Sequence, residues 1–183
     1  MGDEFVAVLE AAQDGSEDAF SALWRDANPA LLCYLRVIAP AVAEDVAAET
    51  WVHVIRGLTA FRGNEAGWRA WLFTTARRRV IDDARRSARR PAVPLDEMTL
   101  ACAPAVPDAA DAALENLDTQ AAMALVGGLP RLQAEAILLR VVAGLDTAEA
   151  ARLLGRSPGA VRVAAHRGLR RLAETVCRPG VTL

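Results

Sequence analysis

Apolar residues recur at three- and four-residue steps through much of the N-terminal half of the chain. This spacing places them on one face of an α-helix and predicts helices over 17–38, 44–60 and 67–86. The pair Asn28-Pro29 is expected to divide the first range in two, because a residue before proline disfavours the helical conformation. We therefore predict four helices here. No strand is predicted, since β-branched and polar residues never alternate over a useful length.

Glycine and proline mark the start of a helical C-terminal part. Pro130 follows a glycine and a leucine and suits the first position of a helix. That helix should run to about Val142, and Gly144 is placed to end it.

Two more helices follow, joined by a short turn. Asp146 and Glu149 are spaced as in a capping box and predict the start of a short helix that closes at Gly155. Ser157, followed by proline, then caps a longer helix that extends through Leu172. A short helix, a turn containing glycine and a longer helix rich in arginine are typical of a helix-turn-helix.

The longer helix is expected to have one buried and one basic face. The buried stripe should consist of Val161, Ala164 or Ala165, Leu169 and Leu172. The polar residues of this segment that remain for the outside are Ser157, Arg162, His166, Arg167, Arg170 and Arg171. A helix fits the major groove of DNA, and arginine binds guanine edges and phosphates, which favours duplex binding over a merely solvated face. No motif ties His166 to a nucleophile, so we interpret it as a groove contact.

Aromatic and arginine side chains share the segment from 61 to 90. The candidate contacts to nucleic acid are Phe61, Arg62, Asn64, Trp68, Arg77, Arg78, Arg85 and Arg86. Stacking surfaces combined with backbone-binding charges suit single-stranded nucleic acid. Trp71 has the spacing of a core residue and is interpreted as mainly structural. The run 77–79 points in three directions, so at most two of its arginines can face one ligand.

The charge of the chain is distributed in four blocks. The 183 residues are 53% hydrophobic and 24% charged, as in a globular protein, and the net charge of −2 argues at first against binding nucleic acid. Residues 1–60 carry −7, 61–91 carry +6, 92–120 carry −6 and 121–183 carry +5. Because charges act over a Debye length of about 8 Å, a phosphate responds to the nearest block and not to the total.

Composition also divides the chain into parts. Proline and alanine with acidic residues dominate the middle, which predicts a linker over 91–120 between a unit at 1–90 and a unit at 121–177, with a tail at 178–183. The fold class expected is all-α, with two small helical domains.

Chemistry beyond binding is not indicated. Cys33, Cys102 and Cys177 are far apart and match neither a disulfide framework nor a zinc site. Glu44, Asp45 and Glu49 form an acidic cluster without a histidine ligand, so we read it as a solvated face or a docking surface. No catalytic residue, metal or cofactor is predicted. An acidic N-terminus and the lack of a long apolar run predict a cytoplasmic protein.

Two sets of motifs resemble the extracytoplasmic-function (ECF) sigma factors of bacterial RNA polymerase. The first set, similar to their domain two, comprises residues 43–51, Phe61-Arg62-Gly63, Trp71-Leu72-Phe73 and Ile81-Asp82. The second, similar to their domain four, comprises Gly128-Leu129-Pro130, Ala148-Glu149-Ala150-Ala151, Leu154-Gly155, residues 157–162 and His166-Arg167. The two sets occur in the family's order, with a linker between them.

The resemblance implies a promoter-specificity subunit. Asp45, Glu49 and Trp51 would bind core RNA polymerase at the clamp helices of its largest subunit. The aromatic and arginine segment would recognise and melt the minus-ten element of promoter DNA. The C-terminal unit would read the minus-thirty-five element and lie against the flap of the second-largest subunit. The linker would thread the path of the RNA, and an anti-sigma factor is a further expected partner.

The chain departs from the family pattern at several positions. Ala48 stands where glutamine is frequent, and Arg78 where asparagine is frequent. Val163 and Ala164 replace a common Ser-Arg pair in the recognition helix, so the target promoter sequence is not transferable.

Two alternatives remain at this point. One is a helix-turn-helix regulator that binds duplex DNA without polymerase, for which the aromatic and arginine segment would be superfluous. The other is a nucleic-acid enzyme, for which the sequence offers no set of metal ligands.

Overall fold

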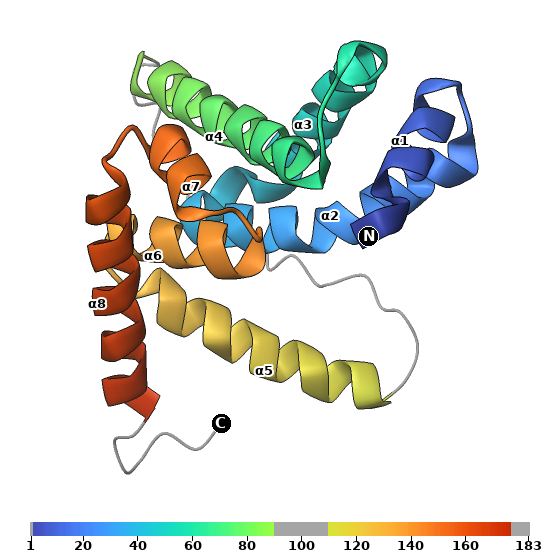
Figure 1. Cartoon of the computed structure of the whole chain (residues 1–183). Helices are drawn as coiled ribbons and strands as arrows, with labels where there is room; N and C mark the ends of the chain where they lie inside the picture. The colour runs from blue at the N-terminus through green and yellow to red at the C-terminus, as the bar shows by residue number, and fades with distance from the viewer. Residues whose placement is uncertain (1, 90–109, 177–183) are drawn as a thin grey trace.

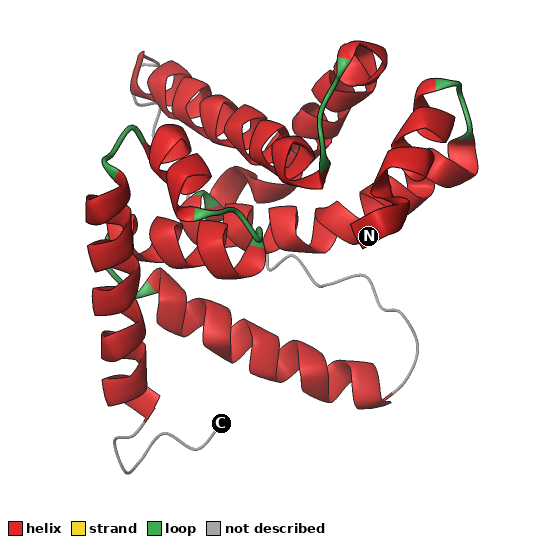
Figure 2. Cartoon of the chain, viewed as in Figure 1, coloured by secondary structure: helices red, strands yellow, loops and turns green. Residues whose placement is uncertain are grey.

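A computed structural model describes residues 2–89 and 110–176, and every regular element in these ranges is helical (Figure 2). The helices are α1 (Phe5–Gln13), α2 (Glu17–Ile38), α3 (Ala43–Gly57), α4 (Glu65–Arg89), α5 (Ala110–Gly127), α6 (Arg131–Ile137), α7 (Thr147–Leu154) and α8 (Pro158–Val176). A π-helical turn, η4 (Leu138–Val142), extends α6. The all-α fold class is confirmed.

Helix α2 runs without interruption through Pro29, so the predicted break at Asn28-Pro29 is wrong. Proline removes one backbone hydrogen bond from a helix interior. The helix continues because Leu23, Ala27 and Leu31, on both sides of the proline, lie on one fully buried stripe. Tertiary packing therefore outweighs the local preference.

Two helical segments differ from the sequence-based interpretation. The sequence pattern did not predict α1, which packs on α2 through the buried residues Phe5 and Leu9. The N-terminal unit thus has four α-helices, but α1 takes the place of the expected division of α2. Helix α5 begins at Ala110, so the last part of the predicted linker is helical. Residues 91–109 and the tail at 178–183 lie outside the described residues.

Aromatic rings form the centre of the N-terminal core. The indole of Trp68 contacts the rings of Phe5, Trp51, Phe61 and Trp71 at centroid distances of 5.7–6.4 Å. Burying large rings contributes much of the apolar stabilisation of a small domain, on the order of 2–3 kcal/mol for each fully buried side chain. This core fixes α3 and α4 relative to each other.

The helix-turn-helix has the caps expected from its sequence. The side chain of Asp146 accepts a hydrogen bond from the Glu149 amide at 2.7 Å, and the Glu149 carboxylate accepts one from the Asp146 amide at 2.9 Å. Gly155 ends α7 in the left-handed conformation, and Ser157 Oγ accepts from the Ala160 amide at the start of α8. The capping box and the turn are therefore confirmed.

The buried stripe of α8 differs from the prediction toward its C-terminal end, where Leu172 is only half-buried and Leu169 is exposed. Val161, Ala164 and Ala165 are buried as expected, but Leu169 is 49% exposed. Gly168 faces the core in its place, where an added Cβ would lie 2.7 Å from Ile137 Cδ1. The absence of a side chain at Gly168 lets α8 approach α6 closely.

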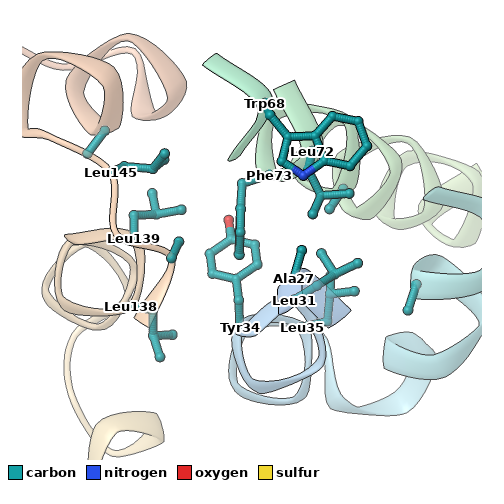
Figure 3. Close-up of a cluster of buried hydrophobic side chains, with 14 of the residues drawn as sticks. Ala27, Leu31, Tyr34, Leu35, Trp68, Leu72, Phe73, Leu138, Leu139 and Leu145 are labelled. Atoms are coloured by element: carbon teal, nitrogen blue, oxygen red, sulfur yellow. The ribbon is translucent and has the colours of Figure 1, made fainter. Parts of the chain in front are cut away.

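The two helical units share one hydrophobic core. Leu138, Leu139 and Leu145 of the C-terminal unit lie opposite Tyr34 of α2 and Phe73 of α4 (Figure 3). The Tyr34 and Phe73 rings meet edge to face at 5.5 Å. Helix α7 also lies against α4, and η4 against α2 (Figure 1). The protein therefore adopts a closed arrangement in which the units are packed together.

Candidate nucleic-acid and partner surfaces

The basic face of α8 points to solvent. Arg162, His166 and Arg167 are exposed, and among the described residues no acidic group lies within ion-pair distance of either arginine. Arg170 and Arg171 are exposed further along the helix, where Arg170 pairs with Glu174 at 3.0 Å. The guanidinium groups of Arg162 and Arg167 stand free to meet phosphate or base edges.

Val163 and Ala164, the two residues of the recognition helix that depart from the family pattern, differ in their exposure. Ala164 is buried against the rest of the C-terminal unit, whereas Val163 is 48% exposed on the basic face. Compared with the common Ser-Arg pair, this chain therefore lacks a polar side chain at one exposed position only, Val163. Ser157 serves as the cap of α8 through its Oγ, so its side chain is already engaged.

The acidic residues of α3 lie on a helix face that is also apolar. Asp45 is exposed, and Glu49 pairs with Arg79 of α4 at 2.7 Å. Trp51, by contrast, is buried and donates from Nε1 to Asn28 Oδ1 at 2.9 Å. Its placement in the core corrects the prediction that it contacts a partner, because its ring and its polar atom are both occupied.

Two residues of this face were missed by sequence reasoning. Val52 and Ile55 are 46% and 54% exposed and follow Asp45 and Glu49 at helical spacing. The signal was present, since apolar residues one and two turns after an outward-facing acid must also face outward. We call Asp45, Glu49, Val52 and Ile55 the α3 surface. It combines an apolar patch with negative charge, as protein-binding surfaces often do.

The loop before α4 is held by side-chain hydrogen bonds. Asn64 caps α4 by accepting from the Gly67 amide at 2.9 Å, and Arg62 donates to the carbonyls of Thr59 and Phe61. Gln13 of α1, which sequence reasoning did not single out, donates to the carbonyls of Leu58 and Phe61 at 2.8 Å. The loop is therefore preorganised, with Arg62 and Asn64 on its exposed side.

The structure reverses the expected roles of two tryptophans. Trp68 is 1% exposed and lies on the same stripe as Leu72 and Val80, so it is a core residue and not a direct contact to nucleic acid. Trp71 is half-buried and stacks on Phe61 at 5.3 Å with an interplanar angle of 12°. The burial of Trp68 was predictable, because the four-residue step from Trp68 to Leu72 places both side chains on one face of the helix.

The run 77–79 points in three directions, as predicted. Arg77 faces the C-terminal unit and lies 3.6 Å from the Glu135 carboxylate, and Arg79 turns to Glu49. Arg78 is exposed. Further along α4, Arg85 and Arg86 are exposed and lie near Asp82 and Asp83 at 3.8 and 3.5 Å. Such exposed pairs are weak enough to exchange their partner for phosphate.

The junction between the units contains ionisable groups. Glu135, 3% exposed, lies 3.5 Å from Arg131 and 3.6 Å from Arg77. Burial, together with the negative charge of Glu135, raises the pKa of Tyr34 well above its usual value. Burial raises the pKa of the Cys33 thiol, which favours the unreactive protonated form.

Neither a metal cluster nor a membrane-spanning helix is found within 2–89 and 110–176. Across these ranges, no three histidine, cysteine or acidic side chains gather as a metal site would require. None of the helices described is both long and apolar enough to cross a bilayer. Cys102 and Cys177 lie outside the described residues.

Comparison with known proteins matches both units. Residues 23–90 match the family model for Sigma-70 region 2, and residues 111–172 match that for Sigma-70 region 4. The chain is 36% identical to the ECF RNA polymerase sigma factor ShbA of Streptomyces griseus, over 91% of this chain and 92% of ShbA. It is 34% identical to the ECF RNA polymerase sigma factor BldN of Streptomyces coelicolor, over 91% of this chain but only 64% of BldN.

A solved structure has the same fold. The structure of CnrH in complex with the cytosolic domain of CnrY aligns with a TM-score of 0.61 and 24% identity, and covers 95% of this chain and 97% of that chain.

Proposed function

The chain belongs to the ECF sigma factors of the sigma-70 family, and on that premise we propose that it is a promoter-specificity subunit of RNA polymerase. The observation that carries the proposal is the presence of both a region 2 unit and a region 4 unit, in order, on one chain. A regulator that binds only duplex DNA would need the second unit alone. No step of the proposed function requires chemistry by the chain itself.

The upstream promoter element is assigned to α8. Arg162, His166 and Arg167 lie on one exposed face without ion-pair partners within the described residues, which supports insertion of this face into the major groove. Arg170 and Arg171 follow one turn later and suit phosphate contacts.

The melted minus-ten element is assigned to α4 and the loop before it. The exposed polar groups are Arg62, Asn64, Arg78, Arg85 and Arg86. The stacked pair of Phe61 and Trp71 offers an aromatic platform for an unpaired base, with Trp68 beneath it as part of the core. Arg77 joins this set once it is released from Glu135.

Polymerase binding is assigned to the α3 surface. Asp45 and Glu49 supply charge, and Val52 and Ile55 supply the apolar area that a stable interface needs. The partner proposed is the clamp-helix pair of the largest polymerase subunit, with the C-terminal unit lying against the flap of the second-largest subunit. An anti-sigma factor that covers these faces is a further proposed partner, and the site of action is the cytoplasm.

Reconstituted transcription tests the proposal. Purified chain is added to core polymerase on a supercoiled library of genomic fragments, and the 5′ ends of the RNA are sequenced. We expect start sites that depend on the chain and share two upstream elements. Copurification from cells, read by mass spectrometry, should recover polymerase subunits. Start sites identical with and without the chain would contradict the proposal.

A further inference from the structure

Between Arg162 and Arg167, the exposed face of α8 contains one large apolar side chain, Val163. Val163 follows Ala160 by one turn and precedes His166 and Arg167 by one turn, so it occupies the middle of the outward face. Gly159 and Ala160, on the preceding turn, are small and also exposed. A helix that begins with small side chains can approach the base edges closely, which brings Val163 within reach of the groove floor.

The chemistry of a valine restricts what it can recognise. Val163 offers neither a donor nor an acceptor, so it cannot hydrogen-bond to phosphate or to the polar edge of a base. In the major groove, the apolar group that distinguishes one base from the others is the C5-methyl of thymine. Val163 also borders a shallow groove lined by Pro130, Leu132 and Gln133, which continues the apolar surface.

We propose that Val163 is a specificity-determining residue that reads the methyl group of one thymine in the upstream promoter element. This inference rests on the proposed function, since it requires α8 to enter the groove. It assigns a base to a position where the family commonly has a polar residue, and so predicts a promoter preference of this chain's own.

Replacement of thymine by deoxyuridine tests this contact, because it deletes only the methyl group. On a promoter found by reconstituted transcription, each thymine of the upstream element is replaced in turn, and holoenzyme binding is measured. One replacement should weaken binding by about fourfold, as expected for one methyl transferred from water. Val163→Ala should reduce this sensitivity, because the shorter side chain loses most of its contact with the methyl group. Leu169→Ala, which truncates an equally exposed residue on another side of α8, should retain it.

The outcomes separate the two levels of the proposal. Equal binding to thymine and deoxyuridine at every position, or unchanged sensitivity in Val163→Ala, would overturn the assignment of Val163. An upstream element without thymine would also overturn it. The failure of the holoenzyme to form or to initiate would instead contradict the proposed function.

Discussion

At the scale of single residues, the arginines divide into those neutralised within the protein and those left free. Arg69 pairs with Asp26 at 2.8 Å, Arg79 with Glu49, and Arg77 with Glu135. Arg162 and Arg167 have no such partner in the described part of the chain. An arginine without a partner gains most from phosphate or guanine, because no internal ion pair has to be broken first. We therefore propose that Arg162 and Arg167 lie on the DNA-binding face of α8.

Replacing Arg162 and Arg167 with alanine should weaken upstream DNA binding and leave polymerase binding unchanged. Each arginine bound to a guanine edge contributes about 1–3 kcal/mol of binding free energy. Removing an arginine that binds a phosphate should reduce the slope of the logarithm of the binding constant against the logarithm of the salt concentration by about one. Binding of the holoenzyme to upstream duplex at several salt concentrations measures both. Arg140→Ala, an exposed arginine outside α8, is the control for the change in charge. Equal reductions of DNA and polymerase binding would mean that α8 is only structural.

Replacing Asp45 and Glu49 with lysine should have the opposite effect. The two substitutions make the charge of the α3 surface more positive by four units, so a basic partner is repelled instead of attracted. Polymerase binding in a pull-down assay should therefore be abolished. Upstream duplex binding by the free chain should persist. Glu10→Lys combined with Glu17→Lys, on other helices, reproduces the change in net charge. Retained polymerase binding would refute this interface.

Ile55→Ser tests the apolar part of the same surface. The side chain is 54% exposed, so its removal should leave the fold intact, while the smaller apolar area should reduce polymerase affinity by about tenfold. Val6→Ser, at an equally exposed residue of α1, should have no effect. An unchanged affinity in Ile55→Ser would restrict the interface to its charged residues.

At the scale of elements, local signals predicted the C-terminal unit better than the N-terminal one. Caps are short-range features, so Asp146, Glu149 and Ser157 defined their helices from sequence alone. The continuity of α2 through Pro29 depends on packing partners distant in sequence, which one sequence does not reveal. The same limit applies to Trp51 and Trp68, whose aromatic neighbours come from several different helices. The exposed residues Val52 and Ile55 were predictable from helical spacing.

Asp146→Ala should destabilise the C-terminal unit by removing the α7 cap. The Glu149 amide would lose its acceptor and the reciprocal hydrogen bond would lose its geometry, for a cost of about 1 kcal/mol in the free energy of unfolding. Urea denaturation measures this change. Glu174→Gln, which weakens only an exposed ion pair, should cost less than about 0.5 kcal/mol. Equal effects of the two variants would argue against a contribution from the cap.

At the scale of the whole molecule, each of the four charge blocks can be matched to one proposed partner. Under the proposed function, the blocks of −7, +6, −6 and +5 would correspond to the polymerase-binding helices, the minus-ten surface, the linker and the duplex-binding unit. Their near cancellation to −2 leaves little long-range attraction for DNA. Promoter recognition should therefore require polymerase to hold both basic blocks in place. The closed arrangement of the two units could not be predicted from the sequence, because it depends on contacts between residues far apart in the chain.

The most direct test of the proposed function is the affinity of the chain for one of its own promoters, measured with and without core polymerase at physiological salt. We expect weak binding by the free chain with little preference over unrelated duplex, and tight promoter-specific binding once core polymerase is present. Tight and specific binding by the chain alone, unchanged by polymerase, would contradict the proposed function and identify a duplex-binding regulator instead.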